Sequence, residues 1–344
     1  MTRPGPPQGP AVSASGLTRR FGETVAVRGL DLAVAHGEIF ALLGPDGAGK
    51  TTALRMLCGA LAPTAGHVTI DGIELARDPG AVQRRIGYMP QRFSLYGDLS
   101  VQENLDFYAD LFEVPRAVRR ERAARLLEFS RLAGVEHRLA EHLSGGMKQK
   151  LALACTLIHA PTILLLDEPT TGVDPVSRRE FWRILYELHR DGATILTSTP
   201  YMDEAERCTT VGLMYRGELI SVEEPGAIRA RMRGEVVEVL AEPKAAARRA
   251  LRGAPEVLSE AVFGDRLHIV VPHAEAAIPS LTARLASRGV LVRDARPVAP
   301  SLEDVFISMI EERGARGASR RSPGGAASRG GTAPGAGGED GGRG

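Results

Sequence analysis

The chain has 344 residues, of which 43% are apolar and 25% charged, values typical of a folded protein with room for about two domains. Its 43 basic and 42 acidic side chains nearly cancel, so the net charge gives no reason to expect a nucleic-acid partner. No apolar run approaches the roughly 20 residues that cross a bilayer, and the N-terminus lacks the apolar stretch of a secretory signal, so we expect a cytoplasmic protein.

Both ends of the chain differ in composition from the rest. Residues 1–12 are rich in proline and glycine, and residues 313–344 are rich in glycine with scattered arginine, serine and proline. Segments of this kind bury too little apolar surface to offset the entropy that is lost on ordering. We therefore expect a disordered N-terminus and a disordered Gly/Arg-rich tail.

Residues 13–224 alternate between short apolar runs and helical stretches. The mostly apolar runs at 39–43, 163–166 and 194–196 are typical of parallel strands that are buried on both faces. Each is followed by a helical stretch, which predicts a layered α/β domain. From residue 101 onward helical periodicity replaces the strands, so we predict a helical insertion at about residues 92–143.

Residues 225–312 have a different pattern, which predicts a smaller second domain. In chain order we expect a strand, a helix, two strands joined by a turn, a helix and a strand, at about 236–240, 243–251, either side of 264–265, 274–287 and 290–292. This β-α-β-β-α-β order is that of ferredoxin-like α+β domains. Ser301 and Asp304 then form a capping box that opens a last helix.

Residues 44–51 read GPDGAGKT and match the phosphate-binding loop pattern G-x-x-x-x-G-K-[ST] between a predicted strand and a predicted helix. The glycines allow backbone N–H groups to surround phosphate oxygens, and the helix N-terminus adds partial positive charge. Lys50 supplies a compact point charge, and the Thr51 hydroxyl is a ligand for Mg²⁺. The residues that we expect to bind the nucleotide here are Gly44, Asp46, Gly47, Ala48, Gly49, Lys50, Thr51 and Thr52.

Two acidic residues follow the apolar run at 163–166. Asp167 and Glu168 would lie at the carboxyl end of a buried strand, where open α/β sheets bind their ligands. We expect Asp167 to hold Mg²⁺ through water and Glu168 to act as the general base that polarises an attacking water.

The motif LSGGM at 143–147 precedes the predicted helix KQKLALACTLIHA and resembles the signature motif of ATP-binding-cassette (ABC) proteins. The resemblance implies a P-loop NTPase core with antiparallel β and helical subdomains. It also implies that Ser144, Gly145 and Gly146 face the γ-phosphate of an ATP held by a second subunit. Three further positions match the family: Gln91 as a ligand of Mg²⁺ and of the attacking water, Asp174 in the loop that crosses between subunits, and Phe21 as the ring that stacks on adenine.

One position departs from the family pattern. A switch histidine should follow the strand ending LTST, and this chain has Pro200 there. Proline has no side-chain donor or acceptor. Contact with the γ-phosphate is therefore expected to be weaker or to be made by Thr199, Tyr201 or a partner.

Within the family, the segments GPDGAGKTT, PQRFSLYGDLSVQENLDFYADLF and LSGGMKQKLALAC look like bacterial export cassettes that pair with separately encoded permeases. The C-terminal domain, which ends in PSLEDVF, is similar to an appendage that is frequent in that group. This resemblance implies an ATPase subunit that uses ATP and Mg²⁺ and exports drug-like or amphipathic cargo. It would work as a dimer of identical cassettes at the inner face of the cell membrane, without nucleic acid. Apolar residues after Gln91, namely Phe93, Leu95 and Tyr96, are expected either to receive a helix of the permease or to pack in the core.

Two alternatives stay open. One is a soluble ABC-type switch on ribosomes or DNA, although the paired cassettes, basic linker or long coiled coils of such proteins are not seen in this sequence. The other is an ATP-binding subunit with poor turnover, because Pro200 replaces the switch histidine.

Overall fold

The structure is a computed structural model that describes residues 9–92 and 95–319. Phe93 and most of the two predicted disordered ends lie outside the described residues. Regular structure nevertheless reaches further than composition predicts at both ends. Ala11 is fully buried and its carbonyl accepts a hydrogen bond from the Asp71 amide (2.9 Å). The last helix, α11 (Leu302–Ser319), continues past residue 312, because its glutamate, arginine and alanine residues favour helix even where glycine is interspersed.

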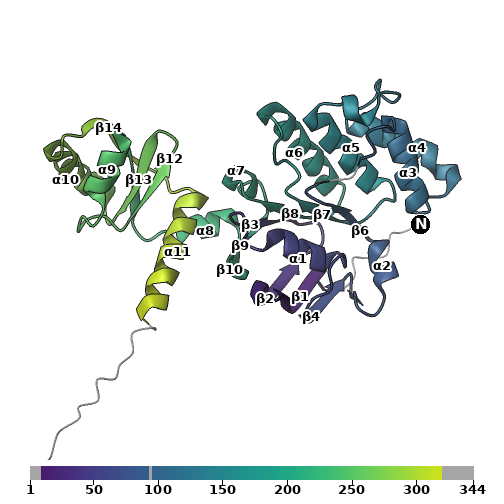
Figure 1. Cartoon of the computed structure of the whole chain (residues 1–344), viewed down its shortest axis with the longest axis horizontal. Helices are drawn as coiled ribbons and strands as arrows, with labels where there is room; N and C mark the ends of the chain where they lie inside the picture. The colour runs from purple at the N-terminus through teal and green to yellow at the C-terminus, as the bar shows by residue number, and fades with distance from the viewer. Residues whose placement is uncertain (1–8, 93–94, 320–344) are drawn as a thin grey trace, which may run out of the picture.

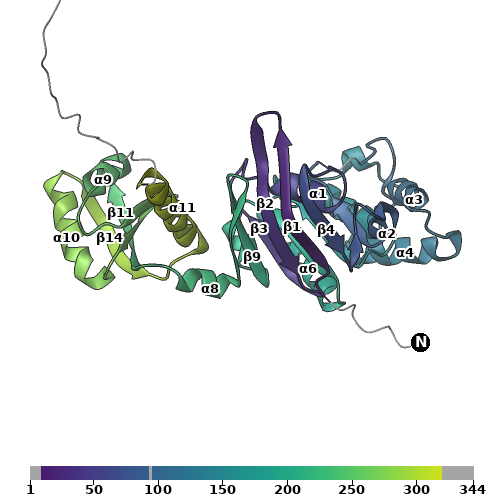
Figure 2. The same ribbon diagram turned by 90° about the horizontal axis from the view of Figure 1, so that it is seen from below.

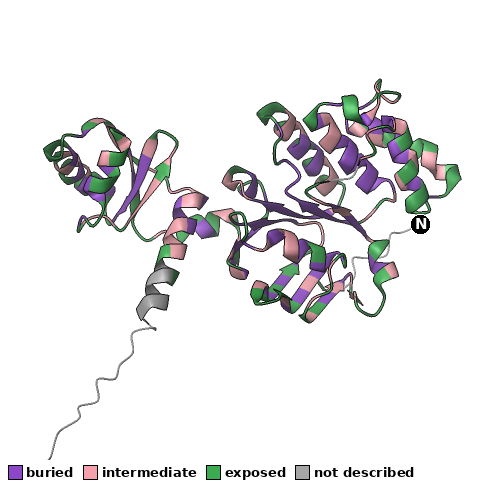
Figure 3. Cartoon of the chain, in the orientation of Figure 1, coloured by how far each residue is buried: buried purple, intermediate pink, exposed green. Residues whose placement is uncertain are grey.

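A six-stranded sheet forms the centre of the larger domain, in the order β10-β9-β3-β8-β7-β6. All neighbours are parallel except β10, which pairs antiparallel with β9. Figure 3 shows β3, β7 and β8 buried along their lengths. The strands are β3 (Ile39–Leu43), β6 (Ile86–Met89), β7 (Ile163–Asp167), β8 (Thr194–Thr199), β9 (Thr210–Tyr215) and β10 (Glu218–Glu223).

Successive side chains along the central strands point to opposite faces of the sheet and so contribute to two separate hydrophobic cores. Phe40, Leu42 and Leu165 face the core that contains α1 and the N-terminal strands, whereas Leu43 and Leu166 face the core that contains α5 and α6. Figure 1 shows these layers on opposite faces of the sheet. The helices are α1 (Lys50–Leu57), α5 (Gly145–Leu157), α6 (Pro175–Arg190) and the short α7 (Met202–Ala205).

The N-terminal strands form a second, antiparallel sheet in the order β2-β1-β4-β5. It consists of β1 (Val12–Phe21), β2 (Thr24–Val34), β4 (Ala65–Ile70) and β5 (Ile73–Glu74), followed by α2 (Pro79–Gln83). The predicted helical insertion contains α3 (Val101–Leu111), α4 (Arg116–Phe129) and a 3₁₀ turn (Ala140–His142). A capping box between Ser100 and Glu103 starts α3.

The C-terminal domain has the predicted β-α-β-β-α-β order, preceded by α8 (Pro225–Ala230). Its antiparallel sheet has the order β12-β13-β11-β14, and α9 and α10 share one hydrophobic core with it. Its elements are β11 (Glu235–Glu242), α9 (Lys244–Leu251), β12 (Ser259–Phe263), β13 (Arg266–Val271), α10 (Ala274–Ser287) and β14 (Leu291–Val298).

Helix α11 lies between the two domains (Figure 2). Its buried Leu302, Val305 and Phe306 belong to the same core as α5 and α6, and the Phe306 ring meets that of Tyr215 edge to face. On the other side, Asp304 contacts His268 of β13 at 2.9 Å. Within the described residues, no helix has the length and apolar character needed to cross a bilayer.

Candidate nucleotide-binding site

The phosphate loop, residues 44–51, connects β3 to α1 as predicted. Gly47 and Gly49 have φ values of 76° and 105°, which glycine adopts without strain. A Cβ atom on Gly44 would collide with the carbonyl oxygen of Met214, so the loop also needs glycine for close packing against β9. The loop is thus a backbone cradle of the kind that surrounds phosphate oxygens.

Lys50 is the charged group inside this cradle and is only 3% exposed. Its Nζ donates to the carbonyls of Gly44 (2.8 Å) and Pro45 (3.2 Å) and lies 3.1 Å from Oε1 of Glu168. Three donors on one ammonium group are therefore gathered at the mouth of the loop. A phosphate group could replace the carbonyls as their acceptor.

Asp167 ends β7 beside the loop and is fully buried. Its Oδ1 accepts hydrogen bonds from Ser198 Oγ (2.7 Å) and Thr51 Oγ1 (3.0 Å), whereas its buried Oδ2 has no hydrogen-bond partner. Burial raises the pKa of Asp167, against the opposing effect of the two hydroxyl donors. A buried carboxylate oxygen without a donor, next to a threonine hydroxyl, fits Mg²⁺, which prefers oxygen ligands.

Glu168 is held between two other site residues. Its Oε2 accepts from Nε2 of Gln91 (2.9 Å), its Oε1 faces Lys50, and its backbone N–H donates to Ser198 Oγ (3.0 Å). Its φ of 48° lies in the left-handed region, which is uncommon for a side chain larger than glycine. Such a conformation persists only where the surroundings enforce it, and it is frequent at functional sites.

Sequence analysis did not identify Ser198, which bridges the two acids. It lies opposite Asp167 in the register of β7 and β8, and its hydroxyl contacts both Asp167 and the amide of Glu168. The signal for it was the polar end of the strand at residues 197–199, directly after the apolar Ile195 and Leu196. Polar residues at that edge of a parallel sheet are candidates for a ligand site.

The signature residues begin α5 and have a separate local role. Ser144 is the N-cap, and its Oγ accepts from the amide of Met147 (3.3 Å). A Cβ on Gly146 would collide with the side chain of Ser177, whereas a Cβ on Gly145 would meet no atom within 4 Å. Among the described residues, no hydrogen bond or ion pair joins the side chain of Ser144 to the phosphate loop.

Two further predicted residues have local partners. Phe21 ends β1 and is 48% exposed, with the guanidinium of Arg19 4.7 Å from its ring centre. Asp174 is the N-cap of α6, and its Oδ1 accepts from the amides of Val176 (3.1 Å) and Ser177 (3.0 Å). The hydrogen bond from Ser177 lowers the pKa of Asp174, which is the expected effect of donors on a carboxylate.

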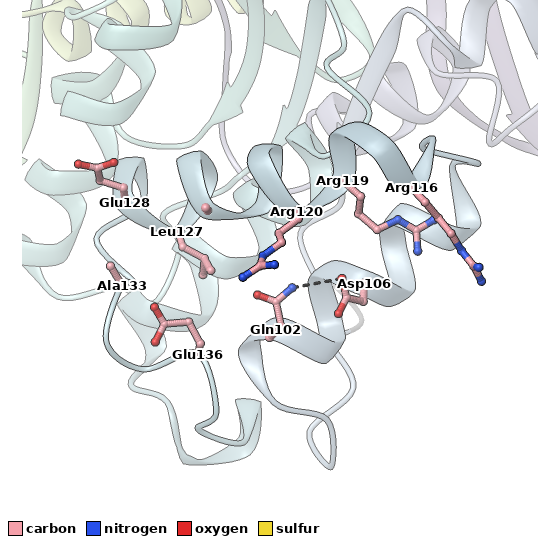
Figure 4. Close-up of a pocket in the computed structure, with 10 residues that line it drawn as sticks. Gln102, Asp106, Arg116, Arg119, Arg120, Leu127, Glu128, Ala133 and Glu136 are labelled. Atoms are coloured by element: carbon pink, nitrogen blue, oxygen red, sulfur yellow. Dashed lines mark hydrogen bonds between the residues drawn. The ribbon is translucent and has the colours of Figure 1, made fainter.

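A hollow of about 860 Å³, separate from the phosphate loop, lies between α3 and α4 on the helical insertion (Figure 4). Charged side chains line it, but several are already paired: Gln102 Nε2 donates to Asp106 (3.1 Å), and Arg119 donates to Asp110 (2.6 Å). The first contact lies within α3, and the second joins α4 to α3. The phosphate loop does not contribute to this hollow.

Comparison with known proteins places these features in a family. Residues 27–171 match the ABC transporter family, and residues 224–310 match the C-terminal domain of DrrA1-3-like ATP-binding proteins. The chain is 43% identical over 304 residues to a probable multidrug ABC transporter ATP-binding protein of Escherichia coli, covering 87% of this chain and 52% of that protein. It thus spans about half the length of that relative.

Other relatives match over nearly their whole length. A daunorubicin resistance ATP-binding protein of Streptomyces coeruleorubidus is 35% identical over 310 residues, covering 89% of this chain and 96% of that protein. The Nod factor export ATP-binding protein I of Paraburkholderia xenovorans is 38% identical, covering 87% and 96%.

Solved structures agree with the fold. A dimeric ATP-binding cassette in a post-hydrolysis state, bound to ADP and Pi, matches with a TM-score of 0.57 and 27% identity, covering 62% of this chain and 98% of that one. An ATP-binding subunit of an ABC transporter matches with a TM-score of 0.59 and 29% identity, covering 64% and 92%. The predicted fold class is therefore confirmed.

Proposed function

This chain belongs to the family of ABC transporter ATP-binding proteins, and we propose that it binds and hydrolyses MgATP to drive export through a separately encoded membrane permease. The observation that carries the proposal is the cluster of Lys50, Asp167, Glu168 and Gln91 at one edge of the central sheet, beside the phosphate loop.

The cluster supplies each group that phosphoryl transfer to water needs. Lys50 would turn its Nζ from the Gly44 and Pro45 carbonyls to the phosphates of ATP. Thr51 and Asp167 would hold Mg²⁺ with Gln91, and the ion would neutralise charge on the phosphates. Glu168 would accept a proton from the attacking water, and Gln91, already bonded to that carboxylate, would orient the water.

We propose that a second, identical cassette completes the site. Ser144, Gly145 and Gly146 open α5 with backbone N–H groups, and the open space over Gly145 leaves room for a phosphate from another chain. Asp174 begins α6 and lies in the loop expected to cross to that chain. The likeness to a solved dimeric ATP-binding cassette supports this arrangement.

The permease would dock on the apolar surface of the helical insertion. Tyr96 is 43% exposed and its ring lies 4.5 Å from that of Phe107, while Leu111 is 60% exposed. The buried Asn104 holds the Tyr96 backbone through two hydrogen bonds, from the Tyr96 amide (2.9 Å) and to its carbonyl (3.0 Å). Leu95 instead packs partly buried against the core of the insertion. An apolar surface that is held in the open is typical of a partner-binding site.

Drug-like or amphipathic cargo is proposed from the relatives, whose names refer to multidrug, daunorubicin and Nod factor export or resistance. In this role the chain would be peripheral to the inner face of the cell membrane, without nucleic acid. The intact catalytic cluster favours this function over a subunit that only binds ATP, despite Pro200.

Equilibrium ATP binding by the variant Lys50→Ala tests the proposal. Loss of the ammonium group that faces the phosphates should weaken binding at least tenfold, about 1.4 kcal/mol. The matched control is Lys244→Ala in the C-terminal domain, where Nζ donates to the Gly264 carbonyl (2.5 Å) and ATP affinity should not change. Equal affinity of Lys50→Ala and the parent chain would rule out the assignment of the loop.

A further inference from the structure

An acidic residue with no role in the site described above is almost completely buried beside it. Glu204, on the short helix α7, is 1% exposed. Its Oε1 accepts a hydrogen bond from Thr170 Oγ1 (2.5 Å), and its Oε2 accepts one from Thr199 Oγ1 (2.8 Å). Both threonines are buried as well. One carboxylate group therefore joins two chain segments that are separated by the whole of α6.

These segments flank the reacting groups. Thr170 lies two residues after Glu168, in the loop that leads to α6. Thr199 is the last residue of β8 and directly precedes Pro200, and its carbonyl accepts from the Gly44 amide of the phosphate loop (3.4 Å). The carboxylate of Glu204 thus connects the segment after the general base with the strand end that borders the phosphate loop.

Arg178 supplies the cation that a buried carboxylate needs. Its Nε lies 3.6 Å from Oε1 of Glu204, and its guanidinium stacks on the ring of Tyr201, 4.3 Å from the ring centre. Arg178 belongs to the first turns of α6, the helix that Asp174 caps. Arg178 therefore joins the start of α6 to the segment around Pro200 through two contacts, one with Glu204 and one with Tyr201.

The two residues next to Pro200, Thr199 and Tyr201, have their polar or aromatic groups engaged in these contacts. The Thr199 hydroxyl gives its proton to Glu204 and accepts a hydrogen bond from the Tyr201 amide (3.0 Å), so it has no proton to donate to a phosphate. The ring of Tyr201 is covered on one face by Arg178. In this arrangement Thr199 does not replace the switch histidine as a donor to the phosphate but fixes the loop in place.

We propose that Glu204 is a positioning residue for ATP hydrolysis, an inference that rests on the proposed function. Its carboxylate holds Thr170 and Thr199 at a fixed separation and so keeps Glu168, in its uncommon left-handed conformation, aimed at the attacking water. The Glu204 carboxylate contacts Thr170, Thr199 and Arg178 and acts through the two loops. Binding of ATP depends on the phosphate loop, so Glu204 affects the hydrolysis step and leaves ATP affinity alone.

The test compares ATP hydrolysis and ATP affinity in Glu204→Gln and Glu204→Ala. We expect kcat to fall at least about tenfold in Glu204→Ala, since small displacements of reacting groups are costly, while KM and Kd for ATP stay within about twofold. Glu204→Gln keeps the volume and part of the hydrogen bonding, so it should fold and show an intermediate kcat. The control is Glu206→Gln, at the exposed C-cap of the same helix, whose carboxylate pairs with Arg229 (3.3 Å) and whose loss should change neither value.

Two further variants separate positioning from a general loss of structure. Thr170→Val and Thr199→Val each remove one hydroxyl and should lower kcat, but neither should lower it further when Glu204 is already alanine, because both act through that carboxylate. Additive effects, an unchanged kcat in Glu204→Gln, or a parallel loss of kcat, ATP affinity and thermal stability would overturn the inference. Hydrolysis that depends on Glu168 but not on Glu204 overturns this inference alone, whereas hydrolysis that does not depend on Glu168 overturns the proposed function with it.

Discussion

Gly145 offers a change that should leave the isolated chain intact and affect only the site that we propose two chains share. An added Cβ at this position meets no atom within 4 Å, and Gly145 is the first residue of α5. Alanine is a better helix former than glycine by up to about 1 kcal/mol. The variant Gly145→Ala should therefore be as stable as the parent chain or more so, with an increase in Tm of at most about 2–4 °C for a domain of this size.

The same methyl group would occupy the space through which, in the proposed dimer, a phosphate held by the second chain reaches the backbone N–H groups of α5. Loss of one oriented donor in a water-poor site costs about 10²- to 10³-fold in rate. Turnover of MgATP by Gly145→Ala should fall by about that factor, and the MgATP-dependent dimer should weaken when measured by light scattering in a Glu168→Gln background.

Gly146 is the matched comparison. A Cβ there would collide with the side chain of Ser177 within the same chain, so Gly146→Ala should lower Tm as well as turnover. Normal turnover and normal dimer formation by Gly145→Ala would refute the shared site. A lower Tm for this variant would refute the structural reasoning about the open space.

Further variants test other parts of the structure. Pro200→His adds an oriented donor beside the phosphate site and should raise a low kcat by up to about 10²-fold, whereas an equal or lower kcat at normal ATP affinity would show that the site is not slowed by the proline. Tyr96→Ser should abolish the stimulation of ATP hydrolysis by the permease and spare basal hydrolysis, and an equal loss of both would make Tyr96 a structural residue. Burial lowers the pKa of His268, but the hydrogen bond and charge of Asp304, with Glu238, raise it overall. The contribution of this contact to the free energy of unfolding is fully present below the pKa of His268 in the unfolded chain, about 6.5. It is lost as the pH rises through the higher pKa of His268 in the folded chain. The difference in Tm between the parent chain and His268→Gln should therefore shrink from pH 6 to 9, and a constant difference would contradict this.

Much of the site could be predicted because its parts are local in sequence. The phosphate loop is a contiguous motif between a strand and a helix, and Asp167 ends an apolar run that is buried on both faces. Parallel strands bring their carboxyl ends to one edge, so the two motifs had to meet there. The order of elements in the C-terminal domain followed from alternating periodicity in the same way.

Contacts between distant segments could not be predicted. The hydrogen bonds of Glu204 join Thr170 and Thr199, which are ordinary polar residues until the sheet places β7 beside β8. Likewise, the apolar face of α11 gave no indication that it would bury Phe306 in the core of the larger domain. Composition predicts which segments can fold, but it cannot predict an individual backbone hydrogen bond. The predicted disordered N-terminus therefore includes Ala11, whose carbonyl in fact accepts a hydrogen bond from the Asp71 amide.

Phosphate release from MgATP by the purified chain, compared with Glu168→Gln, tests the central claim most directly. The parent chain should release phosphate, and Glu168→Gln should bind ATP with similar affinity but release phosphate at least about 10²-fold more slowly, because the amide cannot accept the proton of the attacking water. Equal rates of phosphate release by the two proteins would contradict the assignment of Glu168 and of the site as an ATPase.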